Sequence, residues 1–259
     1  MPIPKQKPVK DVNKHLRPIS LMPVLSKVAE EFVVAEHLRP SILKEIGDNH
    51  FGAIPESSTT HALISMVHSW TKHTDSTGST VRVVLFDYRK ASDLTRKLLA
   101  LDIPVGVSFW IIDFLTDRTQ RVNLGEDCLS EWRNVPEGVP QGTKLGPWLF
   151  ILMIDDIKTS NTELWKYVDD TTIAECVDKK EDSRIQSDLE ELIAKSNQNK
   201  FQLNESKCKE LRISFAKSAA DFAPIVINGK AIEVVSIVKL LGLIISSDLR
   251  WNCHVAENK

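Results

Sequence analysis

A β-branched, mostly apolar run at residues 81–86 constrains the fold more than any other feature of the sequence. The run reads Val-Arg-Val-Val-Leu-Phe, which predicts a buried strand, and it ends on Asp87. Much later, residues 164–168 and 171–174 form two further β-prone segments around the pair Asp169–Asp170. This pattern predicts a hairpin with an acidic two-residue turn, although the turn lacks the glycine that strengthens such a prediction.

Helical patterns lie on either side of these strands. A helix is expected from about Pro23 to Leu38, capped by Ser20 and ended by Pro40. Its apolar side chains, expected to face the core, are Val24, Leu25, Val28, Phe32, Val33 and Ala35. Further helices are expected at about 58–71, 107–116, 143–156 and 180–199, a hairpin at 121–124 and 131–135, and short strands near 208–215, 224–228, 231–235 and 238–245. The mixed order favours an α+β architecture over a doubly wound parallel sheet.

Composition excludes several classes of protein. The 259 residues are 42% hydrophobic and 26% charged, which excludes a chain disordered or of low complexity throughout. The net charge of −2 gives no bulk basic signature, so any nucleic-acid binding would need a local basic surface. The four cysteines lie far apart without metal-ligand spacing, and the longest apolar run, 148–154, is too short to span a bilayer. The N-terminal residues show no secretory signal, so we expect a soluble, intracellular protein of the cytoplasm or nucleus.

The acidic residues at the strand ends are the candidates for chemistry. A strand end and a hairpin tip can bring together Asp87, Asp169 and Asp170, and clustered carboxylates have raised pKa values unless cations fill the space. Mg²⁺ suits such a cluster because it prefers oxygen ligands and leaves room for substrate phosphate. Two ions about 3.5–4 Å apart can support an in-line phosphoryl displacement. From composition alone, the simpler interpretation that the acidic pair only forms a turn stays open.

The order of several motifs resembles reverse transcriptases. The segment Tyr167-Val-Asp-Asp170 resembles their Tyr-x-Asp-Asp box. Other blocks resemble those of non-LTR, LINE-type retrotransposon polymerases in the same order: Arg17-Pro-Ile-Ser20, Phe51-Gly52 with Ser58-Thr-Thr-His-Ala62, Phe86-Asp-Tyr-Arg-Lys-Ala-Ser-Asp93, Gly138-Val-Pro-Gln-Gly142 with Leu145-Gly-Pro147, Leu203-Asn204 with Lys207 and Lys209, Leu240-Leu-Gly242, and Leu249-Arg-Trp-Asn-Cys-His254. Each block is weak evidence by itself, and their common order covers nearly the whole chain.

This resemblance implies an architecture and an activity. The expected fold is the right-hand polymerase fold, with fingers at about 1–80, a palm with an antiparallel sheet and remaining fingers elements at about 81–246, and the start of a thumb connection at 247–259. The implied activity is RNA-directed DNA synthesis, in which a nucleotide passes from a dNTP to a primer 3′-OH. The implied partners are an RNA template with a DNA primer and dNTPs, with no membrane; nothing indicates the oligomeric state.

The resemblance also implies roles for individual residues. Asp87 and Asp169 would ligate two Mg²⁺ ions, for which Mn²⁺ is an alternative, and Asp170 would lie nearby. A backbone carbonyl of Phe86 or Tyr88 is a further candidate ligand. The residues implied for dNTP binding are Arg17, Lys27, Ser92, Gln141, Gly142 and Lys207, and those for the primer grip are Leu241 and Gly242. For Arg17, Lys27 and Lys207, a solvated surface charge is the open alternative.

The sequence departs from the family pattern at two points. Ser92 stands where relatives usually carry an aromatic ring that excludes a nucleotide 2′-OH. After Asp93 the chain continues directly into the segment before Leu98, so several family residues are missing. With no endonuclease segment and little of the thumb, we expect a fragment or a decaying copy with impaired activity. The alternative function is a degenerate polymerase-like domain that binds RNA without extending a primer.

Overall fold

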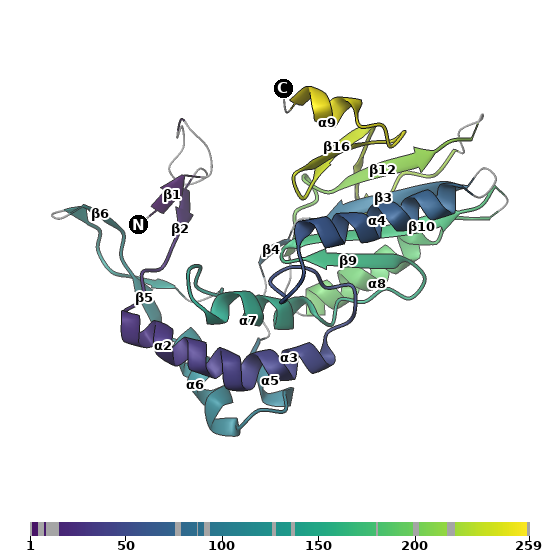
Figure 1. The fold of residues 1–259 in the computed structure, drawn as a ribbon. Helices are drawn as coiled ribbons and strands as arrows, with labels where there is room; N and C mark the ends of the chain where they lie inside the picture. The colour runs from purple at the N-terminus through teal and green to yellow at the C-terminus, as the bar shows by residue number, and fades with distance from the viewer. Residues whose placement is uncertain are drawn as a thin grey trace. The chain divides into compact units, whose positions relative to one another are not determined.

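The computed structural model describes residues 2–4, 8, 16–75, 79–86, 88–90, 94–125, 128–135, 138–179, 181–198, 202–216 and 221–257. The chain divides into two compact units (Figure 1). Unit 1 comprises Met1–Ile46 and Ser92–Ile154, and unit 2 comprises Gly47–Ala91 and Asp155–Lys259. None of the helices within these described ranges is long and apolar enough to cross a membrane.

Unit 1 is mainly helical. Its helices are α2 (Val24–Val33), the π-helical turn η1 (Val34–Leu38), α3 (Arg39–Glu45), α5 (Leu94–Ala100), α6 (Val105–Leu115) and α7 (Leu145–Ile154). Its strand pairs are β1 (Pro2–Pro4) with β2 (Leu16–Pro18), β5 (Arg118–Gln120) with β8 (Arg133–Val135), and β6 (Asn123–Gly125) with β7 (Cys128–Leu129). Helix α7 forms the core of the unit, because seven of its ten residues are buried. The last two strand pairs make a nested hairpin close to the predicted one.

The first long helix differs from its prediction in three ways. Its cap position is Pro23 without a side-chain cap, so Ser20 is not the cap. The helical path continues through Pro40 to Glu45, because the π-helical turn η1 precedes the proline and changes the hydrogen-bond pattern there. The apolar face is not core: Leu25 is 83% exposed. Val24, Val28 and Phe32 are exposed as well, and Val33 and Ala35 are half-buried. The face of α2 that is buried carries Glu30 instead.

Unit 2 is built around a five-stranded sheet of order β15-β12-β3-β10-β9. These strands are β3 (Thr80–Phe86), β9 (Glu163–Tyr167), β10 (Asp170–Val177), β12 (Lys209–Ser214) and β15 (Glu233–Val235). Strand β3 is the central strand, buried along almost its whole length, as its apolar sequence predicts. The four strands β12, β3, β10 and β9 are antiparallel, which confirms the expected sheet, while β15 joins β12 in parallel.

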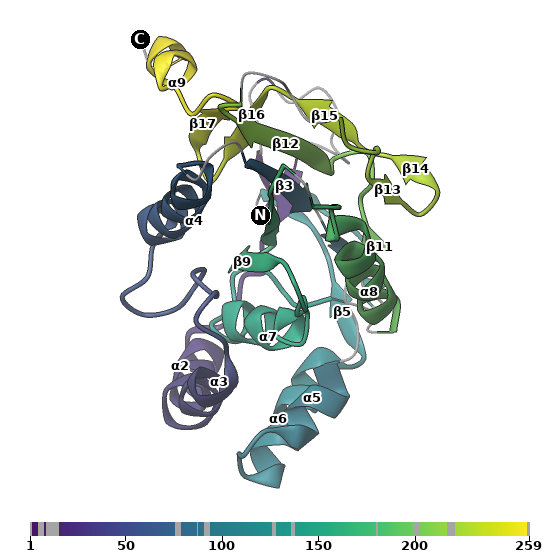
Figure 2. The same ribbon diagram turned by 90° about the vertical axis from the view of Figure 1, so that its right-hand side faces the viewer.

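Two helices flank this sheet. Helix α4 (Thr59–Thr74) lies on one side and α8 (Ile185–Gln198) on the other (Figure 2). Helix α4 begins after Ser58, whose side chain caps it by accepting the N–H of His61. Its buried Trp70 meets Trp165 of β9 edge to face, with ring centroids 6.4 Å apart. These contacts make a hydrophobic core between α4 and the sheet.

Charged side chains cross the sheet on the side of α8. Arg82 of β3 donates from Nε to Glu210 Oε1 of β12 at 2.8 Å, and both side chains are almost fully buried. Arg212 donates to the same oxygen at 2.9 Å. Arg82 also reaches Ser183, just before α8, at 2.8 Å. This ionic network therefore ties the central strand to the start of the helix.

The remaining elements of unit 2 are short. They are β4 (Tyr88–Lys90) paired with β11 (Gln202–Leu203), β13 (Val226–Ile227) with β14 (Lys230–Ala231), β16 (Ile237–Leu240) with β17 (Leu243–Ser246), and helix α9 (Asn252–Glu257). The strands expected near 208–215 and 224–228 are confirmed as β12 and β13, and the segment near 231–235 holds the end of β14 and β15. The single strand expected at 238–245 was wrong, because the chain reverses at Leu241–Gly242 and forms the two strands β16 and β17.

Candidate active site

The predicted acidic hairpin is formed by β9 and β10. Tyr167 pairs with Asp170, so the two-residue turn is Val168–Asp169, one residue earlier than predicted. Val168 has a φ of +52°, a conformation that a β-branched residue rarely adopts. Asp169 lies in the turn and Asp170 opens β10, and both carboxylate side chains are exposed to solvent. The hairpin therefore presents two acidic groups at its tip.

The central strand ends beside this tip. Phe86, the last residue of β3, pairs with Thr171, which follows Asp170 directly. The chain then continues to Tyr88, which pairs with Leu203 in β11. Asp87 itself lies outside the described residues. The described backbone thus places the end of β3 next to the acidic turn.

A segment just before α4 supports the turn from the edge of β9. Phe51 N–H donates to Lys166 O, and Lys166 N–H donates to Asn49 O, each at 2.9 Å. Gly52 then packs directly on the turn, because a Cβ at this position would lie 2.3 Å from Val168 N and 2.5 Å from its Cγ2. Only a residue without a side chain fits there while the turn keeps its place.

Buried polar groups lie next to this contact. Lys166 is almost fully buried and donates from Nζ to Asp155 O at 3.0 Å. His50 Nε2 lies 3.5 Å from Asp155 Oδ1. Burial lowers the pKa of His50, against the opposing effect of Asp155. Burial raises the pKa of Asp155, but His50 and the charge of Lys166 outweigh burial and hold this pKa below its usual value. The lowered pKa values of His50 and Asp155 therefore favour a neutral imidazole beside an ionised carboxylate.

The predicted primer-grip residues form a second tight turn. Leu240 pairs with Leu243, so Leu241 and Gly242 are the two residues of the loop between β16 and β17. Both have positive φ, +49° and +89° respectively, as type I′ hairpin turns require. Leu241 and Asp170 line the same small hollow of unit 2. This turn therefore lies beside the acidic tip.

Two of the segments predicted to bind the nucleotide meet in unit 1. Ser20 N–H donates to Gln141 O at 2.9 Å. Gly142 has a φ of +92°, and a Cβ there would lie 2.9 Å from Ile19 Cγ2 and 3.0 Å from Ser20 O. The Arg17–Ser20 block and the Gly138–Gly142 loop therefore lie side by side, as the order of the motifs alone could not show.

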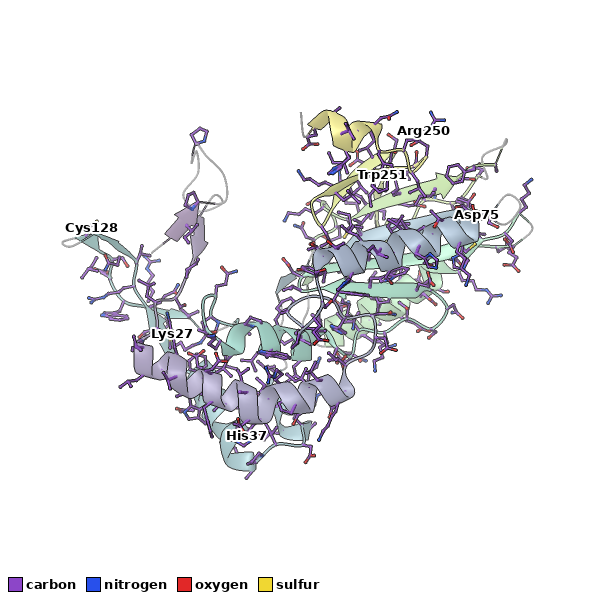
Figure 3. The ribbon with its side chains drawn as sticks, in the orientation of Figure 1. Lys27, His37, Asp75, Cys128, Arg250 and Trp251 are labelled. Carbon is purple, nitrogen blue, oxygen red and sulfur yellow. The ribbon has the colours of Figure 1, made fainter. Side chains whose placement is uncertain are left out.

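The other predicted nucleotide residues are spread over the two units. The backbone of Arg17 belongs to β2 in unit 1. Lys27 is exposed on α2 (Figure 3). Lys207 is exposed in the turn before β12 of unit 2. Ser92 lies outside the described residues, and α5 begins at Leu94, shortly after it.

The model of the reverse transcriptase (RNA-dependent DNA polymerase) family matches residues 3–245. The chain belongs to this family. A curated relative, the RNA-directed DNA polymerase from the mobile element jockey of Drosophila melanogaster, is 26% identical over 267 residues. That match covers 95% of this chain and 28% of the relative, so the chain spans less than a third of that protein's length.

Solved telomerase structures share the fold of this chain. One is the apo telomerase of Candida tropicalis truncated from the C-terminal domain, with a TM-score of 0.53 and 11% identity. The match covers 90% of this chain and 49% of the telomerase chain. The other is telomerase from the same organism with a fragment of telomeric RNA, with a TM-score of 0.56 and 11% identity. That match covers 92% of this chain and 43% of the telomerase chain. The right-hand polymerase fold predicted from the sequence is confirmed.

The donor set at the acidic tip fits the divalent metal ions that reverse transcriptases use. Asp169 and Asp170 offer exposed carboxylate oxygens, which hard cations such as Mg²⁺ prefer. Within the ranges that the structure describes, no three His, Cys, Asp or Glu side chains gather at a metal-binding distance. Asp87, the third predicted ligand, is not among those residues.

Two residues at the site could not be predicted from the sequence. The pair Phe51–Gly52 marked a family block, but nothing in the sequence indicated that Gly52 touches Val168. His50 is a single histidine in a loop, and its buried contact with Asp155 has no sequence signal. Lys166 gave a clue to such a buried contact, because it is a charged residue inside a β-prone segment. A buried strand tolerates a charged side chain only when the charge has partners.

Proposed function

We propose that this chain is the RNA-directed DNA polymerase domain of a non-LTR, LINE-type retrotransposon. It would transfer a nucleotide from a dNTP to the 3′-OH of a primer paired with an RNA template. The observation that carries the proposal is the pairing of Phe86 with Thr171, which joins the end of the central strand to the acidic hairpin tip. The family match over residues 3–245 supports the same activity.

The acidic residues would act together in this reaction. Asp87 and Asp169 would hold two Mg²⁺ ions, with Asp170 adjacent and a carbonyl of Phe86 or Tyr88 as a further ligand. Such ions supply charge stabilisation for the attacking and leaving oxygens of the phosphoryl transfer. The chain's own contribution is a pair of exposed carboxylates, one in the turn and one at the start of β10, where strand pairing on one side and Gly52 on the other hold the turn.

The remaining predicted residues would position the substrates. Gln141 and Gly142 would line the incoming dNTP, with Ser92 near its sugar. Arg17, Lys27 and Lys207 would contact the triphosphate, where fixed positive charge stabilises the departing pyrophosphate. Leu241 and Gly242 would hold the primer backbone, which agrees with the position of Leu241 beside Asp170.

The domain boundaries and the cellular location belong to the same proposal. Residues of about 1–80 would form fingers, 81–246 the palm with further fingers elements, and 247–259 the start of a thumb connection. We place the protein in the cytoplasm or nucleus, where an RNA template would be available.

Primer extension on poly(rA)/oligo(dT) with Mg²⁺ tests the proposal. We expect the parent protein to extend the primer and the Asp169→Ala variant to give no product. Asp182→Ala is a matched control, because Asp182 is also exposed but precedes α8. A fluorescence titration with the same duplex measures binding separately.

The outcomes separate the two functions. Extension by the parent and by Asp182→Ala, but not by Asp169→Ala, supports the polymerase. Binding of the duplex without extension by any of the three proteins supports the alternative of an RNA-binding domain. Extension by Asp169→Ala at the parental rate contradicts the assignment of the acidic site.

A further inference from the structure

Glu30 is a buried carboxylate to which the proposed chemistry gives no role. It lies on α2, and its side chain is 1% exposed. Its Oε2 accepts the backbone N–H of Lys144 at 2.7 Å and that of Leu145 at 3.2 Å. Its Oε1 is also buried and has no hydrogen-bond partner among the residues that the structure describes. A carboxylate in such a place is costly unless it serves a specific contact.

The two amides that Glu30 binds open helix α7. The first N–H groups of a helix have no partner within the helix, and they form its positive end, which a carboxylate stabilises. Thr143 Oγ1 accepts the N–H of Gly146 at 3.1 Å and adds a second cap. Glu30 therefore fixes where α7 begins, and the loop Gly138–Gly142 comes directly before that point.

The same loop is held from the other side by the residues that lead into α2. Ser20 N–H donates to Gln141 O at 2.9 Å. Gly142 is so close to Ile19 and Ser20 that it has no room for a Cβ. The approach to α2 and Glu30 within α2 thus hold the C-terminal end of the loop and the start of α7 that follows it.

We propose that Glu30 is a positioning residue for the incoming nucleotide. By binding the amides of Lys144 and Leu145, its carboxylate keeps the loop Gly138–Gly142 in the conformation in which Gln141 lines the nucleotide. This inference rests on the proposed function, because it takes the role of Gln141 from it. Glu30 itself does not touch the substrate; it acts through the start of α7.

Three single substitutions test the role of Glu30. Glu30→Asp keeps the charge but shortens the side chain by one methylene group, so the carboxylate no longer reaches both amides. Glu30→Gln keeps the length and an acceptor oxygen. Glu31→Asp is the matched control, because the neighbouring Glu31 carboxylate pairs with the Lys144 ammonium group, at 2.6 Å, and both of these side chains are more than half exposed.

The first readout is steady-state primer extension with separate titrations of dNTP and of primer–template. For Glu30→Asp we expect the KM for dNTP to rise about tenfold or more, with the KM for primer–template unchanged, because small displacements of a positioning group have large effects on binding geometry. For Glu30→Gln we expect both KM values to stay within about threefold of the parent, and for Glu31→Asp within about twofold. In both variants a side chain of the original length at position 30 still caps α7. A purely structural role would lower the active fraction and leave both KM values unchanged.

The second readout is hydrogen–deuterium exchange of the free protein, which requires no activity. We expect faster exchange in residues 138–146 of Glu30→Asp and parental exchange in Glu31→Asp. Parental exchange in Glu30→Asp, or an unchanged KM for dNTP while the parent extends primers, would overturn the inference. If the parent extends no primer at all, the proposed function fails, and the exchange measurement alone then decides whether Glu30 holds the loop.

Discussion

Substitution of Gly52 by alanine should damage catalysis far more than stability. The added Cβ would lie 2.3 Å from Val168 N and 2.5 Å from Val168 Cγ2. Ordinary van der Waals contacts begin at about 3.4 Å, so either Gly52 or the Val168–Asp169 turn must move by about 1 Å. The first atom in contact is a backbone atom, which cannot rotate away as a side-chain end could.

The size of the effect follows from this displacement. Catalytic groups must stay within about 0.5 Å of their productive positions, and a misplacement of about 1 Å costs about 100-fold in rate. Overpacking of this kind lowers the free energy of unfolding by about 1–3 kcal/mol. We therefore expect the single-turnover rate of primer extension to fall about 100-fold in a protein that still folds.

The assay combines single-turnover primer extension with urea denaturation of the same preparation. Gly47→Ala is the matched control, because Gly47 precedes the same segment and a Cβ there meets no atom within 4 Å. We expect its rate to equal that of the parent. A Gly52→Ala protein that is folded and extends primers at the parental rate would show that Gly52 does not set the position of the acidic turn.

Three further predictions concern stability and selectivity. Glu210→Gln should lower the free energy of unfolding by about 3–5 kcal/mol in urea denaturation, because it leaves the buried Arg82 charge without its partner; a loss below about 1 kcal/mol would contradict this. Burial raises the pKa of Asp188, but hydrogen bonds from Asn161 and Thr162 outweigh it and lower that pKa below the usual 3.8. A lowered pKa means that the ionised Asp188 stabilises the fold above pH 3.8 and that this stabilisation is lost as the pH falls further. The difference in unfolding free energy between the parent and Asp188→Asn should therefore be largest near neutral pH and should shrink in acid. A difference that does not change with pH would argue against this role of Asp188. Ser92→Phe should reduce the incorporation of ribonucleotides relative to deoxyribonucleotides, because an aromatic ring would exclude the 2′-OH, and equal preferences in the two proteins would disprove the role of Ser92.

The parts of the fold that the sequence predicts well are those with strong local signals. Strand β3 is buried on both faces, so its sequence is mostly apolar, and its one charged residue, Arg82, is paired with Glu210. Helix α4 begins at a serine cap that is visible in the sequence. The long first helix was predicted less well, because its packing selects the face that carries Glu30 and leaves Leu25 exposed. A hydrophobic pattern cannot indicate that a helix buries a carboxylate to cap another helix.

The site shows the same division between local and long-range information. The acidic hairpin was predicted from its residues, but the turn lies one residue earlier, since no local signal favours a positive φ at Val168. The contact of Gly52 with this turn and that of Glu30 with α7 join segments far apart in the sequence. Such contacts depend on tertiary packing, and a single sequence does not reveal them.

Iron-mediated cleavage of the polypeptide tests most directly whether the acids at the end of β3 and at the hairpin tip share one metal site. Fe²⁺ would replace Mg²⁺ in the complex with primer–template and dNTP, and ascorbate with peroxide would generate hydroxyl radicals at the bound ion. If the acids share one site, we expect cuts near residue 87 and near residues 169–170 in the same sample, which Mg²⁺ suppresses by competition and which Asp169→Asn removes from both segments. Cuts near one segment only, or cuts that persist in both segments of Asp169→Asn, would contradict a shared site.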